Sequence, residues 1–274
     1  MNGNVISAVA VLGTLGAVFG LVLAIAAKIF AVEVDERQEA IIGVLPGANC
    51  GGCGYPGCSG YASAIIGEGA AVTRCAAGGA AVAAQIAEIM GIEAGNVTRT
   101  VAAIRCSGTA GKVQKKFDYI GIKDCLAASR INGGPNVCAD GCLGFGTCIK
   151  ACQFDAIYIK DGIAKINHEK CVGCMACSAA CPKSLIVGIP YESEVFVPCA
   201  STARGADVRK FCEAGCIGCK GCEKQCEYDA VAVNNNLSAI DASKCTNCGK
   251  CAANCPRKLI YDSKAGLRDK AVSA

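Results

Sequence analysis

The chain has 274 residues, which is room for two or three small domains and additional segments. Its 24 cysteines would indicate a disulfide scaffold in a short secreted protein, but many lie only two residues apart and so point toward shared metal centres. The single histidine, His168, leaves no second imidazole for a Cys2His2 zinc site, and the formal charge of +4 comes without an aromatic–basic patch for nucleic acid.

The amino terminus is apolar. Residues 5–27 carry no charge, and a helix of that length spans about 35 Å, enough to cross a bilayer core. A cleaved signal peptide is the alternative, because Ala24-Ile25-Ala26 resembles a cleavage site, but no Lys or Arg precedes the run. We therefore expect residues 1–30 to form a retained, single-pass anchor in the cell membrane. Lys28 follows the span, which favours a cytoplasmic location for the rest of the chain.

A linker is expected over 31–46, followed by a small cysteine module over 47–95. The cysteines of this module are Cys50, Cys53, Cys58 and Cys75. The glycines between them let the backbone approach a metal cluster closely, so we predict one four-iron, four-sulfur (4Fe–4S) cluster, with a zinc knuckle or buried thiols as the alternative. Helices are predicted over 61–67 and 80–90, and the second has an apolar face at Val82, Ile86 and Ile89.

Behind this module, nine cysteines each return 74 positions later. The first copy consists of Cys125, Cys138, Cys142, Cys148, Cys152, Cys171, Cys174, Cys177 and Cys181. The second copy consists of Cys199, Cys212, Cys216, Cys222, Cys226, Cys245, Cys248, Cys251 and Cys255. Three groups within the repeat read C-x2-C-x2-C-x3-C, the spacing that wraps thiolates around a cubane cluster. We predict two tandem two-cluster units of the bacterial ferredoxin type, over 96–190 and 191–274, with short strands at 154–159 and 228–233.

In two-cluster ferredoxins the fourth cysteine of each run ligates the other cluster. This rule predicts three complete ligand sets: Cys152, Cys171, Cys174 and Cys177; Cys216, Cys219, Cys222 and Cys255; and Cys226, Cys245, Cys248 and Cys251. The fourth set is broken, because Phe145 stands where the second copy has Cys219. Either that cluster holds three irons or another thiolate replaces the lost ligand. Cys138 is the best candidate for the replacement, so the predicted set is Cys138, Cys142, Cys148 and Cys181.

Four cysteines remain unassigned: Cys106, Cys125, Cys199 and Cys212. Cys199 and Cys212 are the 74-residue partners of Cys125 and Cys138, which indicates a shared geometric role. Four thiols are what one more cluster requires, so the chain is expected to hold five 4Fe–4S clusters and has ligands for a sixth. Buried structural thiols are the alternative for these four.

The cysteine array has no other catalytic motif beside it. We find no dinucleotide-binding fingerprint in a strand–turn–helix context, no P-loop and no nucleophile–base pair. The array therefore predicts transfer of single electrons between clusters. Lys112, Lys115 and Lys116 suit the docking of an acidic ferredoxin, but an ordinary solvated surface is the favoured interpretation of these lysines.

The order of the motifs is more specific than any one of them. A charge-free amino-terminal helix, the motif CGGCGYPGC with Cys75, and ferredoxin-type runs follow one another. This order resembles the B-subunit family of the Rnf membrane complex, in its long form with two ferredoxin units, over essentially the whole chain. Residues 50–75 alone are also similar to the cluster domain of corrinoid iron–sulfur proteins, but the chain lacks their corrinoid-binding barrel.

The resemblance implies a subunit that accepts electrons from soluble ferredoxin and relays them toward membrane and flavin-bearing partners. In such complexes ferredoxin oxidation reduces NAD and drives export of Na+ or H+, and the flavin, NAD and ion sites would belong to other subunits. Two alternatives stay open: a membrane-tethered polyferredoxin of another hydrogenase- or dehydrogenase-type complex, and a zinc-binding scaffold without redox activity. The expected fold class is α+β, with one transmembrane helix, a four-cysteine domain and two ferredoxin-like units.

Overall fold

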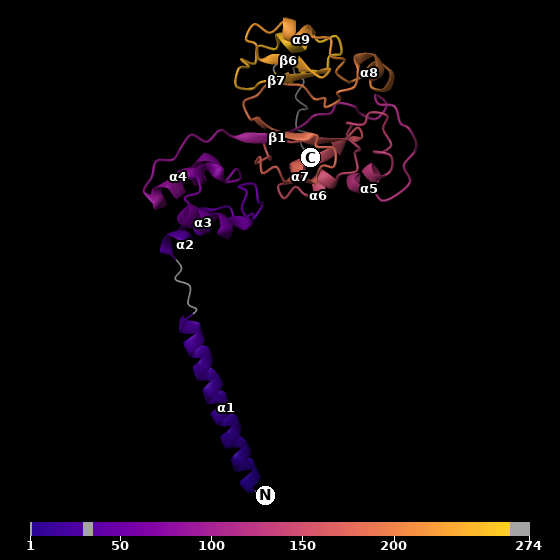
Figure 1. The fold of residues 1–274 in the computed structure, drawn as a ribbon. Coiled ribbons are helices and arrows are strands. Elements are labelled where there is room, and N and C mark those ends of the chain that lie inside the picture. Colours follow the sequence, from indigo (N-terminus) through magenta and orange to yellow (C-terminus); the bar gives the residue numbers. More distant parts are fainter. Residues whose placement is uncertain (1, 30–34, 264–274) are drawn as a thin grey trace.

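The computed structural model of the protein describes residues 2–29 and 35–263. Figure 1 shows a long helix, a small helical module, and two ferredoxin-like units stacked on each other beside that module. Part of the predicted linker (31–34) and the end of the predicted second unit (264–274) lie outside the described residues. The mixed helix and strand content confirms the expected α+β class.

The predicted anchor is one continuous helix, α1 (Asn2–Ile29). Its stretch Ser7–Ile29 is the one helix in the described part of the chain that is long and apolar enough to cross a membrane. Large apolar side chains such as Leu12 and Leu23 are 69% and 68% exposed. No other described part of the protein covers them, as expected for a helix whose apolar surface faces lipid.

The small module consists of helices α2 (Glu36–Val44), α3 (Gly57–Glu68) and α4 (Gly79–Met90), with a 3-10 turn at Val72–Arg74. The predicted helices at 61–67 and 80–90 are confirmed by α3 and α4, and Ile86 of the predicted apolar face is fully buried. The core is formed by Ile41, Tyr61, Ile65, Val72 and Ile86.

The structure contradicts the prediction that residues 31–46 are a linker. Residues 36–44 form α2, which begins at the N-cap Asp35, whose carboxylate accepts a hydrogen bond from the Arg37 N–H at 2.9 Å. The helix packs on α3 and α4, and its Ile41 is 0% exposed. This helix begins with charged residues and buries one apolar side chain, Ile41, so its sequence shows no repeating apolar pattern.

The first ferredoxin-like unit contains four strands in two antiparallel pairs. Strands β1 (Thr100–Ile104) and β4 (Ile186–Pro190) form the outer pair, and β2 (Ile157–Lys160) and β3 (Ile163–Ile166) form a hairpin. The unit has three short helices: α5 (Cys125–Arg130), α6 (Thr147–Lys150) and α7 (Ala176–Ala180). The strand predicted at 154–159 begins at residue 157, because Asp155 has a φ of 48° and forms a turn before it.

The second unit repeats this plan. Strand β5 (Val195–Phe196) pairs with β8 (Tyr261–Asp262), and β6 (Val231–Asn234) pairs with β7 (Leu237–Ile240), again antiparallel. The helices are α8 (Gly205–Phe211), α9 (Gly221–Lys224) and α10 (Lys250–Ala253). The strand predicted at 228–233 is β6, and Asp229, with a φ of 48°, delays its start as Asp155 does in the first unit.

A backbone connection joins the two units. The N–H of Gln114 donates to the carbonyl of Phe211 at 2.8 Å, and the N–H of Glu213 donates to the carbonyl of Lys112 at 2.8 Å. Val113 and Cys212 form the antiparallel bridge between these two bonds. The segment that follows β1 thus pairs with the end of α8, which brings cysteines of both units to one interface.

Candidate metal centres

The cysteines of the small module line one cavity. These residues, here quartet I, are Cys50, Cys53, Cys58 and Cys75. The loop before α3 is held by the Asn49 carboxamide oxygen, which accepts from the Cys58 N–H at 2.8 Å. The loop before Cys75 is held by the buried Tyr61 hydroxyl, which donates to the carbonyl of Ala71 at 2.8 Å. The structure thus brings the predicted set together.

A second predicted set also meets around one cavity, in the first ferredoxin-like unit. This quartet II consists of Cys152, Cys171, Cys174 and Cys177. The N–H of Ala102, in β1, points at the Cys171 sulfur with a nitrogen–sulfur distance of 3.4 Å. Gly173 turns the chain between the cysteines with a φ of 71°, and a side chain there would collide with the carbonyl of Thr100.

The broken set of the first unit is completed by a different cysteine from the one predicted. The third cavity is lined by Cys125, Cys142, Cys148 and Cys181, here quartet III. Burial, followed by the charges of Cys142, Cys125 and Cys181, raises the pKa of Cys148 to about 12, whereas Cys138 is not among these neighbours. We therefore correct the predicted set by replacing Cys138 with Cys125.

The loop before α5 carries Cys125 to this place. Asp124 caps α5, accepting from the N–H groups of Leu126 and Ala127 at 2.9 and 3.0 Å. The Thr147 hydroxyl donates to the same carboxylate at 2.8 Å and accepts from the Cys125 N–H at 2.8 Å. These bonds, between residues more than twenty positions apart, fix the thiol beside α6. The sequence gives no signal for these long-range bonds. It favours Cys138 instead, because Cys138 is nearer to Cys142 in the chain.

Phe145, which stands where a cysteine is expected, packs against an aromatic side chain of the loop before α5. Its ring lies 5.2 Å from the Tyr119 ring, between centroids, and the two planes are tilted by 50°. Such aromatic pairs contribute about 0.5–1.5 kcal/mol beyond area burial. Phe145, in the place of the expected cysteine, thus packs against the same loop that brings Cys125 to quartet III.

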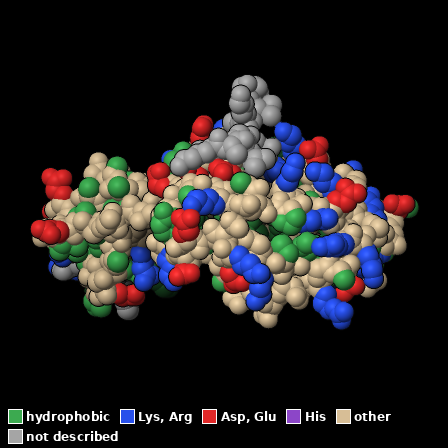
Figure 2. All heavy atoms as spheres, turned by 90° about the horizontal axis from the view of Figure 1, so that it is seen from above, with side chains coloured by type: hydrophobic (Ala, Val, Ile, Leu, Met, Phe, Trp, Pro, Cys, Tyr) green, Lys and Arg blue, Asp and Glu red, His purple; other side chains and the backbone are tan. Residues whose placement is uncertain are grey.

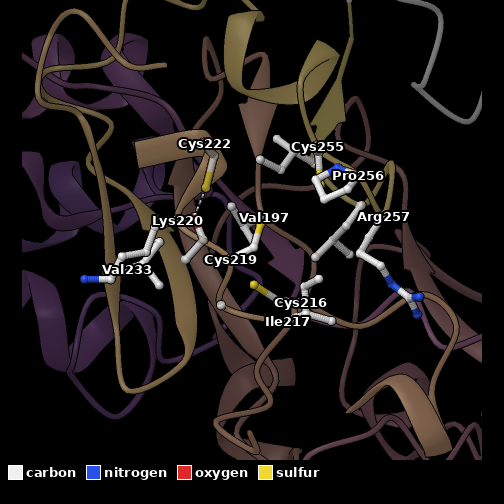
Figure 3. Close-up of a pocket in the computed structure, with 14 residues that line it drawn as sticks. Val197, Cys216, Ile217, Cys219, Lys220, Cys222, Val233, Cys255, Pro256 and Arg257 are labelled. Atoms are coloured by element: carbon white, nitrogen blue, oxygen red, sulfur yellow. Dashed lines mark hydrogen bonds between the residues drawn. The ribbon is translucent and has the colours of Figure 1, made fainter. Parts of the chain in front are cut away.

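The two predicted sets of the second unit are arranged like those of the first. Quartet V consists of Cys216, Cys219, Cys222 and Cys255, which line one cavity. The other predicted set, here quartet VI, is Cys226, Cys245, Cys248 and Cys251: Cys245 and Cys248 are neighbours of Cys251, and Cys226 packs against the same core. Figure 3 shows quartet V around its cavity, with the Arg257 side chain pointing away from it. The Cys222 sulfur and the Ser238 hydroxyl are 3.2 Å apart. In quartet VI, burial and then the charge of Cys245 raise the pKa of Cys251 to about 11.

The remaining four cysteines gather at the interface of the two units. This quartet IV consists of Cys106, Cys138, Cys199 and Cys212. A Cβ atom on Gly108 would lie 3.7 Å from the sulfurs of both Cys106 and Cys212, one from each unit. Burial raises the pKa of Cys138 to about 11, with smaller contributions from Cys106 and Cys212. The predicted grouping of Cys106, Cys199 and Cys212 is kept, and Cys138 takes the place of Cys125.

Quartet IV is built by equivalent positions of the two units. The Cys106 sulfur accepts from the Cys142 N–H and the Cys199 sulfur accepts from the Cys216 N–H, both at 3.4 Å. Cys142 and Cys216 are 74 residues apart, but Cys106 and Cys199 are 93 apart. The structural counterpart of Cys199 is therefore Cys106, and its 74-residue relation to Cys125 is accidental. The first unit is longer by the loop that carries Cys125.

The quartets fit a group larger than a single metal ion. Among the described residues, no three Cys, His, Asp or Glu side chains are close enough to hold one ion. Thiolates around one zinc ion would lie within about 4 Å of each other, because the zinc–sulfur distance is about 2.3 Å. The cysteines of quartets I, II, III and V instead each line a cavity, together with apolar side chains and backbone. Backbone N–H groups aimed at sulfur are a further feature of iron–sulfur sites.

Adjacent quartets are directly connected. Helix α6 contains Cys148 of quartet III and is followed by Cys152 of quartet II, and α7 contains Cys177 of quartet II and is followed by Cys181 of quartet III. Helices α9 and α10 relate quartets V and VI in the same way. The Cys142 N–H joins quartet III to quartet IV, and the Cys216 N–H joins quartet IV to quartet V. At the other end, a Cβ atom on Gly52 would lie 2.9 Å from the Cys174 Cα, so quartet I touches quartet II. The order is therefore I–II–III–IV–V–VI.

Models of known protein families match the regions that hold most of these quartets. A model described as "Putative Fe-S cluster" matches residues 45–77. Three models described as "4Fe-4S binding domain" match residues 164–187, 213–229 and 237–260. The matched ranges contain cysteines of quartets I, II, III, V and VI, whereas all four cysteines of quartet IV lie outside them. Quartet IV is thus the centre that these models do not describe.

Curated relatives extend over nearly the whole chain. The chain is 45% identical to the B subunit of the Na(+)-translocating ferredoxin:NAD(+) oxidoreductase complex of Acetobacterium woodii, covering 95% of this chain and 78% of that protein. It is 44% identical to the B subunit of the proton-translocating ferredoxin:NAD(+) oxidoreductase complex of Clostridium ljungdahlii, covering 94% and 92%. It is 41% identical to the B subunit of the ion-translocating oxidoreductase complex of Methanosarcina acetivorans, covering 95% and 99%. The chain belongs to the B-subunit family of ion-translocating (Rnf-type) oxidoreductase complexes.

Proposed function

We propose that this chain is the electron-relay subunit of a membrane complex that oxidises reduced ferredoxin, reduces NAD and exports Na+ or H+. The observation that carries the proposal is the unbroken order of six cysteine quartets, joined by direct contacts and, for II–III and V–VI, by pairs of packed short helices. Bound 4Fe–4S clusters would accept and donate single electrons. The relatives' names, which include ferredoxin and NAD, support the same assignment for this chain.

Each quartet would hold one cluster, which makes six clusters from 24 cysteines. The chain supplies the thiolates, the apolar walls and the N–H groups that point at sulfur. Burial first, and then neighbouring thiols, raise the pKa of Cys142 to about 11 and that of Cys148 to about 12. These two thiols are thus protonated at neutral pH, and cluster insertion would displace their protons, coupling metal binding to folding.

The helix α1 would cross the membrane with the cysteine-bearing parts on the cytoplasmic side, where thiolates stay reduced. Lys28 in the last turn of α1 supports this orientation. Further partners would be membrane and flavin-bearing subunits that take electrons from the relay. A polyferredoxin of another hydrogenase- or dehydrogenase-type complex would use the same relay, but the similarity over nearly the whole chain favours the first assignment.

The proposal is tested on the full chain, purified without oxygen. We expect about 24 iron atoms per chain, no stoichiometric zinc, and broad visible absorption that decreases when reduced ferredoxin is added. Membrane-spanning flavoproteins should co-purify with the chain from its natural membrane. A colourless, zinc-loaded protein would contradict the proposal, and so would a coloured protein that dithionite reduces but ferredoxin does not.

Gly52 offers a test of the contact between quartets I and II. An alanine Cβ at this position would lie 2.9 Å from the Cys174 Cα and 3.0 Å from its carbonyl oxygen, and backbone atoms cannot move aside as a flexible side chain would. Gly52→Ala should therefore separate the small module from the first unit. We expect unchanged iron content, slower reduction of quartet I, and weaker magnetic coupling between the two clusters in electron paramagnetic resonance spectra.

Gly43→Ala is the matched control for this variant, because a Cβ there meets no atom within 4 Å. It should leave both the reduction rate and the magnetic coupling as in the natural protein. Equal behaviour of Gly52→Ala and Gly43→Ala would show that quartets I and II exchange electrons by another route.

A further inference from the structure

The loop that delivers Cys125 has an apolar tip exposed to solvent. Ile120 is 97% exposed and Ile122 is 75% exposed, the two highest values among the large hydrophobic side chains described. Capping of α5 and ligation through Cys125 do not require these two residues to be apolar. Large exposed apolar side chains at one site are typical of a contact surface for a partner.

The base of this loop is held in place, so the tip is presented in one position. The Lys116 N–H donates to the carbonyl of Pro135 at 2.7 Å, and the Val137 N–H donates to the carbonyl of Gln114 at 2.8 Å. Next to the tip, the Tyr119 ring packs on Phe145. Figure 1 shows the loop and α5 at the outer edge of the first unit, on the side away from the small module.

Charge is unevenly distributed along the chain. Residues 97–190, the first unit, hold 12 Lys and Arg against 6 Asp and Glu, whereas residues 191–263 hold 9 against 9. The small module, 35–96, holds 2 against 6. Figure 2, which shows the face seen from above, has acidic side chains at the end of the molecule formed by the small module and many basic ones over the other part. Bound clusters would add similar negative charge to both units, so the difference between the units would persist.

The loop accounts for a large part of this excess. Residues 112–124 carry four lysines and two aspartates, and Asp124 is occupied by the cap of α5 and by Thr147. The lysines Lys112, Lys115, Lys116 and Lys123 are exposed. The Lys115 ammonium lies 3.9 Å from the Asp118 carboxylate, but both side chains are more than half exposed, so this pair leaves a net positive surface.

We propose that residues 112–124 form the docking surface for an acidic ferredoxin, with Ile120 and Ile122 in the contact and the lysines around it. The inference rests on the proposed function and adds the place at which electrons enter. Cys125 follows this loop directly and is one of the four cysteines of quartet III, which line one cavity. One electron would leave the reduced ferredoxin and one would be gained at quartet III, with no bond made or broken. From there the relay leads through quartet II to quartet I and through quartet IV to quartets V and VI.

Two pairs of substitutions separate the contribution of the lysines to ferredoxin binding from that of the isoleucines. Lys115→Glu with Lys123→Glu should slow the association of an acidic two-cluster ferredoxin about tenfold or more at low salt, because steering is lost. The difference should nearly vanish at high ionic strength. Ile120→Ser with Ile122→Ser should instead speed dissociation about tenfold at any salt concentration, because contact burial is lost after docking. Binding to the full, cluster-loaded chain is followed by surface plasmon resonance.

Matched controls lie outside the loop. Lys224→Glu with Lys244→Glu changes two exposed lysines of the second unit, and Ile92→Ser changes an isoleucine of the small module that is 54% exposed. Both controls should bind ferredoxin like the natural chain. Iron content and reduction by dithionite, which needs no docking surface, should be unchanged in all variants.

The outcomes distinguish this inference from the function on which it rests. If ferredoxin binds and reduces the loop variants as it does the natural chain, the docking surface is wrong and the relay function stands. If ferredoxin fails to reduce even the natural chain, the proposed function fails. If the loop variants keep ferredoxin binding but no longer co-purify with membrane subunits, the loop is a contact within the complex and the inference is overturned.

Discussion

Replacing Cys125 by serine should remove one complete cluster, and replacing Phe145 by cysteine should restore it. In Cys125→Ser the iron content should fall from about 24 to about 20 atoms per chain, because quartet III loses a ligand. Phe145 occupies the ferredoxin ligand position, as its counterpart Cys219 does in quartet V. A thiol at position 145 can therefore take over, although the loss of the Phe145–Tyr119 ring pair costs about 0.5–1.5 kcal/mol.

Cys138→Ser is the control that distinguishes the two candidate ligands. It should also lower the iron content by about four atoms, because quartet IV loses a ligand, but Phe145→Cys should not restore that iron. The measurements are iron analysis and visible absorption after anaerobic purification of each single and double variant. Rescue of Cys138→Ser by Phe145→Cys, with no rescue of Cys125→Ser, would reinstate the set predicted from the sequence.

Removing the cluster of quartet IV should divide the relay into two halves. In Cys212→Ser the iron content should again fall by about four atoms, but the main effect is on electron distribution. Quartet IV connects the Cys142 N–H on one side with the Cys216 N–H on the other, both 3.4 Å from its sulfurs. With electrons entering at the first unit, the clusters of quartets V and VI should be reduced only in a slow phase.

Cys248→Ser provides the comparison for this experiment. Cys248 belongs to quartet VI, at the end of the relay, and is exposed. Its loss should cost a similar amount of iron but leave rapid reduction of all remaining clusters. Stopped-flow absorption after mixing with reduced ferredoxin separates the fast and slow phases. A single fast phase in Cys212→Ser would show that quartet IV is not the bridge between the units.

The cost of Cys212→Ser to folding can be followed separately. The carbonyl of Cys212 accepts from the Arg257 guanidinium at 2.7 Å, and Val113 pairs with the same residue, so the backbone connection between the units does not depend on the thiol. The variant should therefore keep both units together in gel filtration and limited proteolysis. This separates loss of a cluster from loss of the interface.

The sequence by itself determined whatever depends on short spacing. Consecutive cysteines with two residues between them, as in Cys171, Cys174 and Cys177, stay within about 10 Å of each other even in an extended chain, so a single turn brings them to one centre. Uninterrupted apolar character likewise predicted α1, and the ordered motifs predicted the family. These features are local in the chain, so no knowledge of packing is needed to read them.

Only the tertiary structure decided which distant thiols complete a quartet. Cys138 is four residues from Cys142, but the bonds of Asp124 and Thr147 bring Cys125 to quartet III instead. The pairing of residues 112–114 with the end of α8 brings cysteines of both units together in quartet IV. The 74-residue repeat did not predict this arrangement. A loop inserted in one copy changes the residue numbers of the cysteines but not their positions in space. The number of residues between two cysteines limits how far apart they can lie, whereas packing and hydrogen bonds determine which cysteines lie together.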